Sequence, residues 1–381
     1  MSHPDYEAIA RSGVEALRRG DAGAARAAFA EVEAAGRASH QLHLLLAQSC
    51  ELVGDGAAME AALAPVLEAE PRNLYALLMM GENRARLGDD RAASSWLSLA
   101  LSSATKMQGL PPDLPPRLDR ATQTLDAMSR KFEAHLQARL AAAHVDPGEV
   151  GGRFREALEI AAGRAQPQLQ QPTSFYYPRL PQIPFYDPAE FAWAAALEAR
   201  TAEIRAEAEA VLSAGRDLAP YVQRNMDRPT REHALLDDPD WSAYYLWKDG
   251  ALVEDHARAC PATVEALGSP PMPTVENRSP SVLFSVLRAK THIPPHWGML
   301  NTRLICHLPL IVPPDCRLRV GNEVRLVEAG KMLIFDDSIE HEAWNDSDET
   351  RVILLFEIWR PELDAGERHA LTAMFEAIGL Y

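Results

Sequence analysis

Cysteine is scarce in this 381-residue sequence, which has four: Cys50, Cys260, Cys306 and Cys316. No two of them form a close pair, and most stand among apolar neighbours. A disulfide framework and a cysteine zinc site are therefore both disfavoured. Unpaired cysteines fit a reducing compartment, and we expect a cytoplasmic protein.

Long apolar runs and a surplus of positive charge are also missing. The N-terminus reads M-S-H-P-D-Y-E, without a basic segment followed by an apolar one. No later run approaches the roughly 18 apolar residues that cross a bilayer. The formal net charge is −16, which repels nucleic acid and anionic membrane surfaces. We expect no nucleic-acid partner and no membrane span.

Apolar residues make up 47% of the sequence, and its length suffices for two or three domains. In the first hundred residues a Gly-Asp pair recurs every 34 residues, at positions 20, 54 and 88 (54 − 20 and 88 − 54). A small residue stands seven positions before each glycine and a large apolar residue nine positions after it. The small residues are Gly13, Ala47 and Gly81, and the large ones are Phe29, Leu63 and Leu97. The 34-residue period and the alternation of small and large side chains predict helical hairpins, in which the two helices cross closely at the small residues.

This pattern resembles tetratricopeptide repeats over about residues 5–105. Each hairpin can bury its apolar face only against a neighbour, so a further helix should cover the last one. Residues 115–145 can supply that helix, and we assign residues 1–145 to a helical repeat domain. Two functions remain open for it: a concave surface that holds a peptide or protein substrate, or self-association and support of the rest of the chain.

Residues 146–188 predict a short helix followed by a connector rich in proline and aromatic residues. Six prolines between Pro167 and Pro188 exclude a helix or a central strand there. Five aromatic residues interleave them, which indicates a segment packed on a domain surface, and we expect the domain boundary near residue 165. Beyond it, residues 189–214 predict one amphipathic helix, and residues 241–250 predict a strand whose aromatic residues belong to the core.

The stretch from Ser281 to Leu363 predicts a β-sandwich or barrel. Short apolar runs alternate there with Gly, Pro, Asn and Asp; the runs are 281–288, 303–310, 316–320, 331–335 and 351–359. His296 and His341 lie between runs, each at the edge of a strand. Such a pair of histidines can hold a metal.

Arg351 stands in the last apolar run, where both strand faces are apolar, which indicates a buried guanidinium. A buried cation needs an anion. That anion is either a bound carboxylate, as on a cosubstrate, or the side chain of Asp336, Asp337 or Glu357. Ser285, in the middle of another apolar run, can donate its hydroxyl to the same anion.

Three segments resemble the aspartyl/asparaginyl β-hydroxylase family in sequence and order: H-W-G-M-L-N-T-R-L-I-C-H-L-P-L, G-K-M-L-I-F-D-D-S-I-E-H-E-A-W-N-D and R-V-I-L-L-F-E-I-W-R-P-E-L. The resemblance runs from about 170 to 365. It implies a double-stranded β-helix, a jelly-roll or cupin-like fold, over residues 189–381. The family uses Fe(II), 2-oxoglutarate and O₂.

The resemblance also assigns roles to particular residues. His296 and His341 would bind the iron. Arg351 and Ser285 would hold the distal carboxylate of 2-oxoglutarate, and His307 would contact the cosubstrate. These five residues are the predicted site.

Two departures from common patterns bear on this site. Most iron oxygenases carry a carboxylate ligand two residues after the first histidine, whereas Gly298 stands here, as in several members of the family. The resemblance then implies water in that position. Four acidic residues remain as alternative ligands or as hydrogen-bond acceptors for the histidines: Asp336, Asp337, Glu340 and Glu342. Ile305 replaces a basic residue of the animal enzymes, so carboxylate binding is expected to differ.

The predicted activity is hydroxylation of an unactivated C–H bond by a 2-oxoglutarate-dependent dioxygenase, on the β-carbon of an Asp or Asn residue in a peptide or protein. Three alternatives are an inactive repeat-based interaction module, an oxygenase acting on a lipid acyl chain, and a metalloenzyme that uses no 2-oxoglutarate. The joint presence of His296, His341 and Arg351 disfavours the first. The lack of a membrane-anchoring segment disfavours the second.

Overall fold

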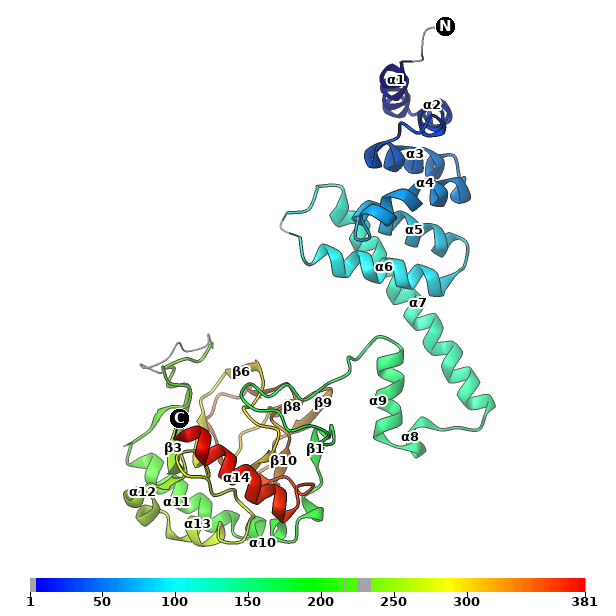
Figure 1. The fold of residues 1–381 in the computed structure, drawn as a ribbon. Helices are drawn as coiled ribbons and strands as arrows, with labels where there is room; N and C mark the ends of the chain where they lie inside the picture. The colour runs from blue at the N-terminus through cyan, green and yellow to red at the C-terminus, as the bar shows by residue number, and fades with distance from the viewer. Residues whose placement is uncertain (1–4, 108, 216, 225–233, 381) are drawn as a thin grey trace. The chain divides into compact units, whose positions relative to one another are not determined.

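The computed structural model describes residues 5–107, 109–215, 217–224 and 234–380 (Figure 1). The chain divides into two compact units, Met1–Arg164 and Ala165–Tyr381. The first unit is helical throughout its described part, and the second is built around two antiparallel sheets. Each unit has apolar clusters of its own.

Three helical hairpins open the first unit. They pair α1 (Tyr6–Arg18) with α2 (Ala22–Ala34), α3 (His40–Leu52) with α4 (Gly56–Ala69), and α5 (Leu74–Arg86) with α6 (Asp90–Ala104). The Gly-Asp pairs form their turns. Each glycine has a φ between +75° and +80°, the left-handed region that ends a helix, and each aspartate accepts a hydrogen bond of 2.9–3.1 Å from a backbone N–H of the next helix.

The predicted close crossings are confirmed. A Cβ atom built on Gly13 would lie 2.6 Å from the ring of Phe29, and one on Gly81 would lie 2.5 Å from Leu97. The small and large residues of the repeat therefore face one another within each hairpin. The tetratricopeptide-type architecture rests on these contacts.

The helix predicted to cover the last hairpin is α7 (Leu114–Ala142). Its first turns bury Leu114, Leu118 and Ala121 against α5 and α6. Two short helices follow, α8 (Pro147–Val150) and α9 (Gly152–Ala161). The end of α9 contacts α7 through Ser129, whose hydroxyl donates to the carbonyl oxygen of Ala162 at 2.6 Å.

Two sheets form the centre of the second unit. In the described residues the larger has the strand order β1-β10-β7-β12-β5-β3-β2, with β4 beside β3, and the smaller has the order β6-β11-β8-β9. The strands of the larger sheet are β1 (Phe185–Tyr186), β2 (Ala219–Pro220), β3 (Trp241–Lys248), β4 (Ala251–Leu252), β5 (Val282–Leu287), β7 (Arg303–Ile311), β10 (Leu333–Phe335) and β12 (Arg351–Trp359). Those of the smaller are β6 (Thr291–His296), β8 (Cys316–Val320), β9 (Glu323–Leu326) and β11 (His341–Asn345).

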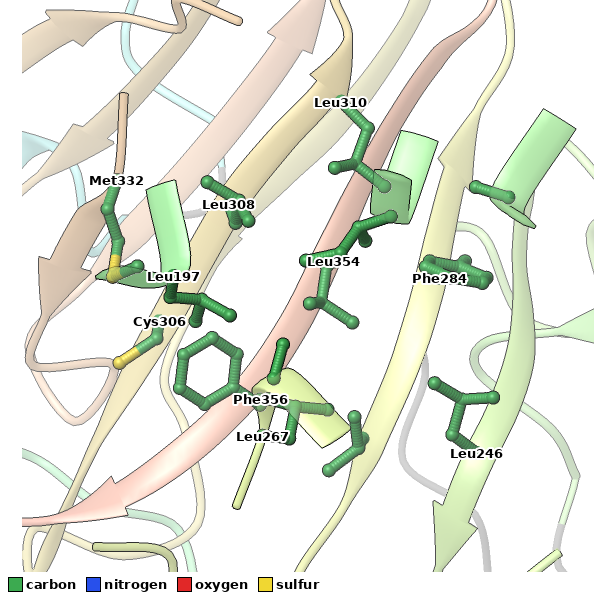
Figure 2. Close-up of a cluster of buried hydrophobic side chains, with 14 of the residues drawn as sticks. Leu197, Leu246, Leu267, Phe284, Cys306, Leu308, Leu310, Met332, Leu354 and Phe356 are labelled. Atoms are coloured by element: carbon green, nitrogen blue, oxygen red, sulfur yellow. The ribbon is translucent and has the colours of Figure 1, made fainter. Parts of the chain in front are cut away.

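The larger sheet separates two apolar layers. One face, which includes Leu354 and Phe356 of β12, packs against α10 (Ala194–Ala199), α11 (Thr201–Ser213) and α13 (Pro261–Ala266) (Figure 2). The opposite face, which includes Leu355, meets the smaller sheet across a second cluster. This arrangement of two facing antiparallel sheets confirms the predicted double-stranded β-helix. A further helix, α12 (Glu254–Ala259), precedes α13, and α14 (Ala365–Gly379) ends the unit.

The single helix predicted over 189–214 is wrong in its details. A 3-10 turn at Pro188–Glu190 comes first, and α10 and α11 are separated at Arg200. The chain between the turn and α10 is held by aromatic contacts instead: Phe191 lies 5.7 Å from Trp193, and Trp193 lies 5.8 Å from Phe356 of the sheet. Packing of these rings outweighs the helical pattern of the sequence.

The proline-rich connector lies in the second compact unit, which begins at Ala165. Its end forms β1, which pairs with β10 at the edge of the larger sheet. None of the described helices is long and apolar enough to cross a membrane.

Candidate metal centre and anion site

His296 and His341 face each other across a strand pair of the smaller sheet. His296 ends β6, His341 begins β11, and the two are direct partners in the antiparallel register. Their ring centroids are 4.0 Å apart. Nδ1 of His296 lies 2.8 Å from the carbonyl oxygen of Pro294, and Nδ1 of His341 lies 3.1 Å from that of Ile339. The tautomer that donates from Nδ1 has its lone pair on Nε2, so the backbone orients both rings as metal ligands.

Burial favours the neutral form of His341. The pKa of His341 lies well below its usual value, first because of burial and then because of the neighbouring His296. Neutral imidazole is the form that binds metal. His341 is therefore ready to bind a cation at neutral pH.

Arg351 is a buried cation without a carboxylate partner among the described residues. Its side chain is 2% exposed, and its Nε has no hydrogen-bond partner. Burial lowers the pKa of Arg351 to about 10, so the guanidinium still carries its charge at neutral pH. A charge in such a place costs several kcal/mol unless an anion compensates it.

The alternative ion pair for Arg351 is wrong, because other arginines take the three carboxylates. Asp336 pairs with Arg360 at 2.6 Å. Asp337 lies 3.4 Å from Arg303, which also forms an ion pair with Glu357. The bound-anion interpretation of Arg351 thus keeps its support.

Ser285 and His307 lie on strands beside Arg351. In the register of the larger sheet, Ser285 is opposite Ile353 and His307 is opposite Leu355, two and four residues from Arg351 on β12 (353 − 351 and 355 − 351). Even spacing places all three side chains on the face that meets the smaller sheet. The pKa of His307 falls to about 3, first because of burial and then because of the charge of Arg351. The structure therefore brings the predicted anion-binding residues together on the inner face.

Asp337 occupies the space beside Gly298. A Cβ atom at position 298 would overlap the Asp337 carboxylate, so only glycine fits there. Oδ1 of Asp337 is buried without a hydrogen-bond partner. No group of three His, Cys, Asp or Glu in the described ranges could hold a metal ion, so the candidate ligand set is the two histidines. Glu340 and Glu342 both pair with Arg319 instead.

Trp241 is a site residue that the sequence interpretation assigned to the core. Its Nε1 donates to the hydroxyl of Ser285 at 3.2 Å, and its ring centroid lies 6.2 Å from that of His296. Tyr221 stacks on its other side, with ring centroids 4.1 Å apart. The aromatic run of β3 carries no sign of which ring faces inward, because that depends on the register with β5, in which Ala243 is opposite Ser285.

The residues present fit a metal and an oxo acid. Two facing imidazoles suit Fe(II) and similar divalent cations, and the buried guanidinium of Arg351 suits a carboxylate. The orphaned Nε of Arg351 and Oδ1 of Asp337 are polar atoms that a bound ligand or water would satisfy.

A double-stranded β-helix with two facing histidines on its inner surface places the second unit among cupin-like proteins. Residues 198–361 match the family model described as aspartyl/asparaginyl beta-hydroxylase. The match covers most of the second unit and less than half of the whole chain, so the chain is similar to this hydroxylase family over residues 198–361.

Three similar proteins illustrate the match. Human aspartyl/asparaginyl beta-hydroxylase is 38% identical over 141 residues, which are 37% of this chain and 18% of that protein. An ornithine lipid ester-linked acyl 2-hydroxylase from Rhizobium tropici is 38% identical over 188 residues, which are 49% of this chain and 63% of that protein. The Sgt2 TPR domain from Aspergillus fumigatus aligns with 33% of this chain and 83% of its own, at 13% identity and a TM-score of 0.29. The chain thus spans less than two thirds of either hydroxylase.

Proposed function

We propose that this protein is an Fe(II)- and 2-oxoglutarate-dependent dioxygenase that hydroxylates the β-carbon of an Asp or Asn residue in a peptide or protein. The observation that carries the proposal is Arg351, a buried guanidinium without a protein carboxylate among the described residues, on the face of the larger sheet that meets the sheet of the two histidines. A metalloenzyme without an oxo acid would have no use for that uncompensated charge. An inactive interaction module would have no reason to keep it.

Each residue has a defined part in this proposal. His296 and His341 hold Fe(II), which supplies the activation of O₂ when bound. Arg351 and Ser285 bind the distal carboxylate of 2-oxoglutarate, and Trp241 fixes the hydroxyl of Ser285 by donating to it. His307, neutral at physiological pH, lies beside that carboxylate as a hydrogen-bonding partner.

The surroundings of the site exclude water. Leu283, Ile305, Leu333 and Leu355 bury their side chains in the layer between the sheets. An apolar wall keeps a strong oxidant from side reactions and strengthens the attraction between Arg351 and an oxo acid. The Asp337 carboxylate lies beside Gly298, and its buried Oδ1, which has no hydrogen-bond partner, can accept a hydrogen bond from water.

Anaerobic binding tests the cofactor assignment. We expect Fe(II) with 2-oxoglutarate to give a charge-transfer absorption band in the full chain, and succinate to form once O₂ is admitted. Arg351→Ala should weaken 2-oxoglutarate binding at least about 100-fold, since charged hydrogen-bonded pairs in buried sites are worth about 3–5 kcal/mol. The matched control is Arg317→Ala, an arginine on the outer side of β8 whose side chain is 43% exposed. The assignment fails if the band is absent and His296→Ala changes nothing.

A second candidate substrate is a lipid acyl chain. The relative from Rhizobium tropici is an acyl 2-hydroxylase by name, and Ile305 is buried in the apolar layer where the animal enzymes carry a basic residue. An apolar residue there suits a substrate without a carboxylate. Succinate release with an Asp peptide, an Asn peptide and a short-chain acyl lipid, measured side by side, separates the two classes.

The repeat unit is proposed to hold the substrate polypeptide. A hollow of about 570 Å³ lies beside the start of α5, lined by Pro71, Tyr75, Met107, Pro111 and others. Its apolar lining and the tyrosine suit an extended peptide. Crosslinking of a substrate peptide followed by mass spectrometry would locate the contact; attachment confined to the second unit would contradict this role.

A further inference from the structure

The connector between the two units carries a buried glutamine with three hydrogen bonds. Gln170 is 6% exposed, although its neighbours Leu169 and Gln171 are exposed. Its Nε2 donates to the Asp336 carboxylate at 2.6 Å and to the carbonyl oxygen of Pro181 at 2.9 Å. Its Oε1 accepts from the amide of Asn301 at 2.9 Å. Both the NH₂ group and the carbonyl oxygen of this buried side chain thus have hydrogen-bond partners, which fixes its orientation.

Asn301 and Asp336, the two side-chain partners of Gln170, are each five residues away from one of the two histidines. Asn301 comes five residues after His296, and Asp336 comes five residues before His341 (301 − 296 and 341 − 336). The loops 297–302 and 336–340 that carry them come from different parts of the chain. One side chain from a third segment therefore ties together the loops that leave the two candidate ligands.

The backbone that follows Gln170 repeats this connection. The N–H of Gln171 donates to the carbonyl oxygen of Ser338 at 2.7 Å, in the loop before His341. The N–H of Thr173 donates to the carbonyl oxygen of Gly298 at 2.9 Å, in the loop after His296. Farther along, Phe175 packs edge-on against Phe375 of α14, with ring centroids 5.1 Å apart, and this contact anchors the connector.

The far ends of both loops are also fixed. The Asp336 carboxylate accepts from Arg360, from the N–H of Ser338 at 3.0 Å and from its hydroxyl at 2.6 Å. Asn301 exchanges hydrogen bonds with the backbone of Tyr177 at 2.7 and 2.8 Å. Arg360 also donates to the carbonyl oxygen of Asn301 at 3.4 Å, so Gln170 and Arg360 both connect Asp336 with Asn301.

We propose that Gln170 is a positioning residue for the metal centre: it fixes the loops of His296 and His341 relative to each other and so keeps the two imidazoles at chelating separation. The inference rests on the proposed function in so far as the histidines bind a metal. Gln170 touches neither histidine, and it acts through Asn301 and Asp336. Residues that orient ligands in this way change metal affinity by about 10- to 100-fold when they are replaced.

Gln170→Met tests the proposal in the full chain. Methionine has nearly the length of glutamine but makes none of its three hydrogen bonds, so packing is retained. Anaerobic titration of the metal-free protein with Co(II), followed by its visible absorption, should show a dissociation constant raised at least about tenfold. Gln166→Met is the matched control, because Gln166 is exposed on the same connector. A folded Gln170→Met protein with the affinity of the control overturns the proposal.

Hydrogen exchange in the unmutated protein gives a second readout that does not depend on a variant. If the connector favours the metal-bound arrangement, metal must by linkage stabilise the connector. We expect Co(II) to slow exchange of the amides of Gln171 and Thr173, but not of amides in α1 and α2. Unchanged exchange despite bound Co(II) overturns the role of Gln170 alone. Absence of Co(II) binding by the unmutated protein overturns the metal centre itself.

Discussion

At the scale of single residues, the site combines groups whose charge states are set by burial. His341 and His307 are held neutral, while Arg351 keeps its charge with no carboxylate beside it. Two uncharged imidazoles and one guanidinium without a carboxylate leave the protein with an uncompensated buried positive charge. In the proposed function, the dicarboxylate would compensate that charge and a divalent metal would use the uncharged His341.

Burial of His307 has a consequence for stability that pH can reveal. Its folded pKa of about 3 lies below the unfolded value of about 6.5, so the folded state disfavours its protonation. The stability that comes from the neutral ring is complete above pH 6.5 and declines as pH falls toward 3. Between pH 6.5 and 5, the unfolded state of the metal-free protein should bind up to about one proton more than the folded state because of His307. His307→Leu should remove this difference.

The measurement is the free energy of unfolding in urea at several pH values. The slope of the unmutated protein should exceed that of His307→Leu by up to about 1.4 kcal/mol per pH unit. The same substitution at the exposed His369 is the matched control. Equal slopes for the unmutated protein and His307→Leu would contradict the burial of a neutral His307.

At the scale of elements, the sequence allowed prediction of those parts that repeat or alternate. The hairpins of the first unit were found from three Gly-Asp turns, and five strands of the second unit from apolar runs. Strands β6 and β11 were not found, because T-H-I-P-P-H contains two prolines and H-E-A-W-N has little apolar alternation. These strands carry the two histidines, and their sequences depart from the apolar alternation that is typical of strands, as is common at functional sites.

The site itself was predicted unevenly for the same reason. A family resemblance and residue spacing indicated His296, His341 and Arg351. The structure pairs the two histidines in register and puts Arg351 on a strand of the facing sheet. Trp241 and Gln170 act through partners that lie 44 and 131 or more residues away (285 − 241 and 301 − 170), and no local pattern in the sequence marks such pairs. Long-range side-chain hydrogen bonds need the fold before they can be seen.

The hairpin crossings give a prediction about one element. Gly81→Ala places a methyl group against Leu97, which is fully buried, and should lower the free energy of unfolding of the repeat unit by about 1–3 kcal/mol. Gly23 lies in the first turn of α2 with only the Asp21 carboxylate nearby, at 3.7 Å. Gly23→Ala should therefore be neutral or stabilising by up to about 1 kcal/mol. Thermal unfolding followed by circular dichroism compares the two; equal effects would contradict the close crossing.

At the scale of the whole molecule, the boundary between the units decides what belongs to the site. Residues 165–188 follow the repeat unit in sequence, yet their hydrogen bonds go to the loops of the two histidines and their last strand pairs with β10. The segment that leads out of the repeats is thus a part of the second unit. Two units with separate apolar cores should unfold in two transitions.

Two fragments test this boundary. A fragment of residues 165–381 keeps Gln170, the connector and β1, and should fold and bind Co(II) with the affinity of the full chain. A fragment of residues 189–381 loses the partner of Asn301 and Asp336 and exposes the edge of β10, so buried polar groups are left unpaired at about 1–3 kcal/mol each. It should unfold at a lower temperature and bind Co(II) more weakly. Equal melting temperatures and affinities for the two fragments would place the start of the catalytic unit at residue 189 and make the connector a mere linker.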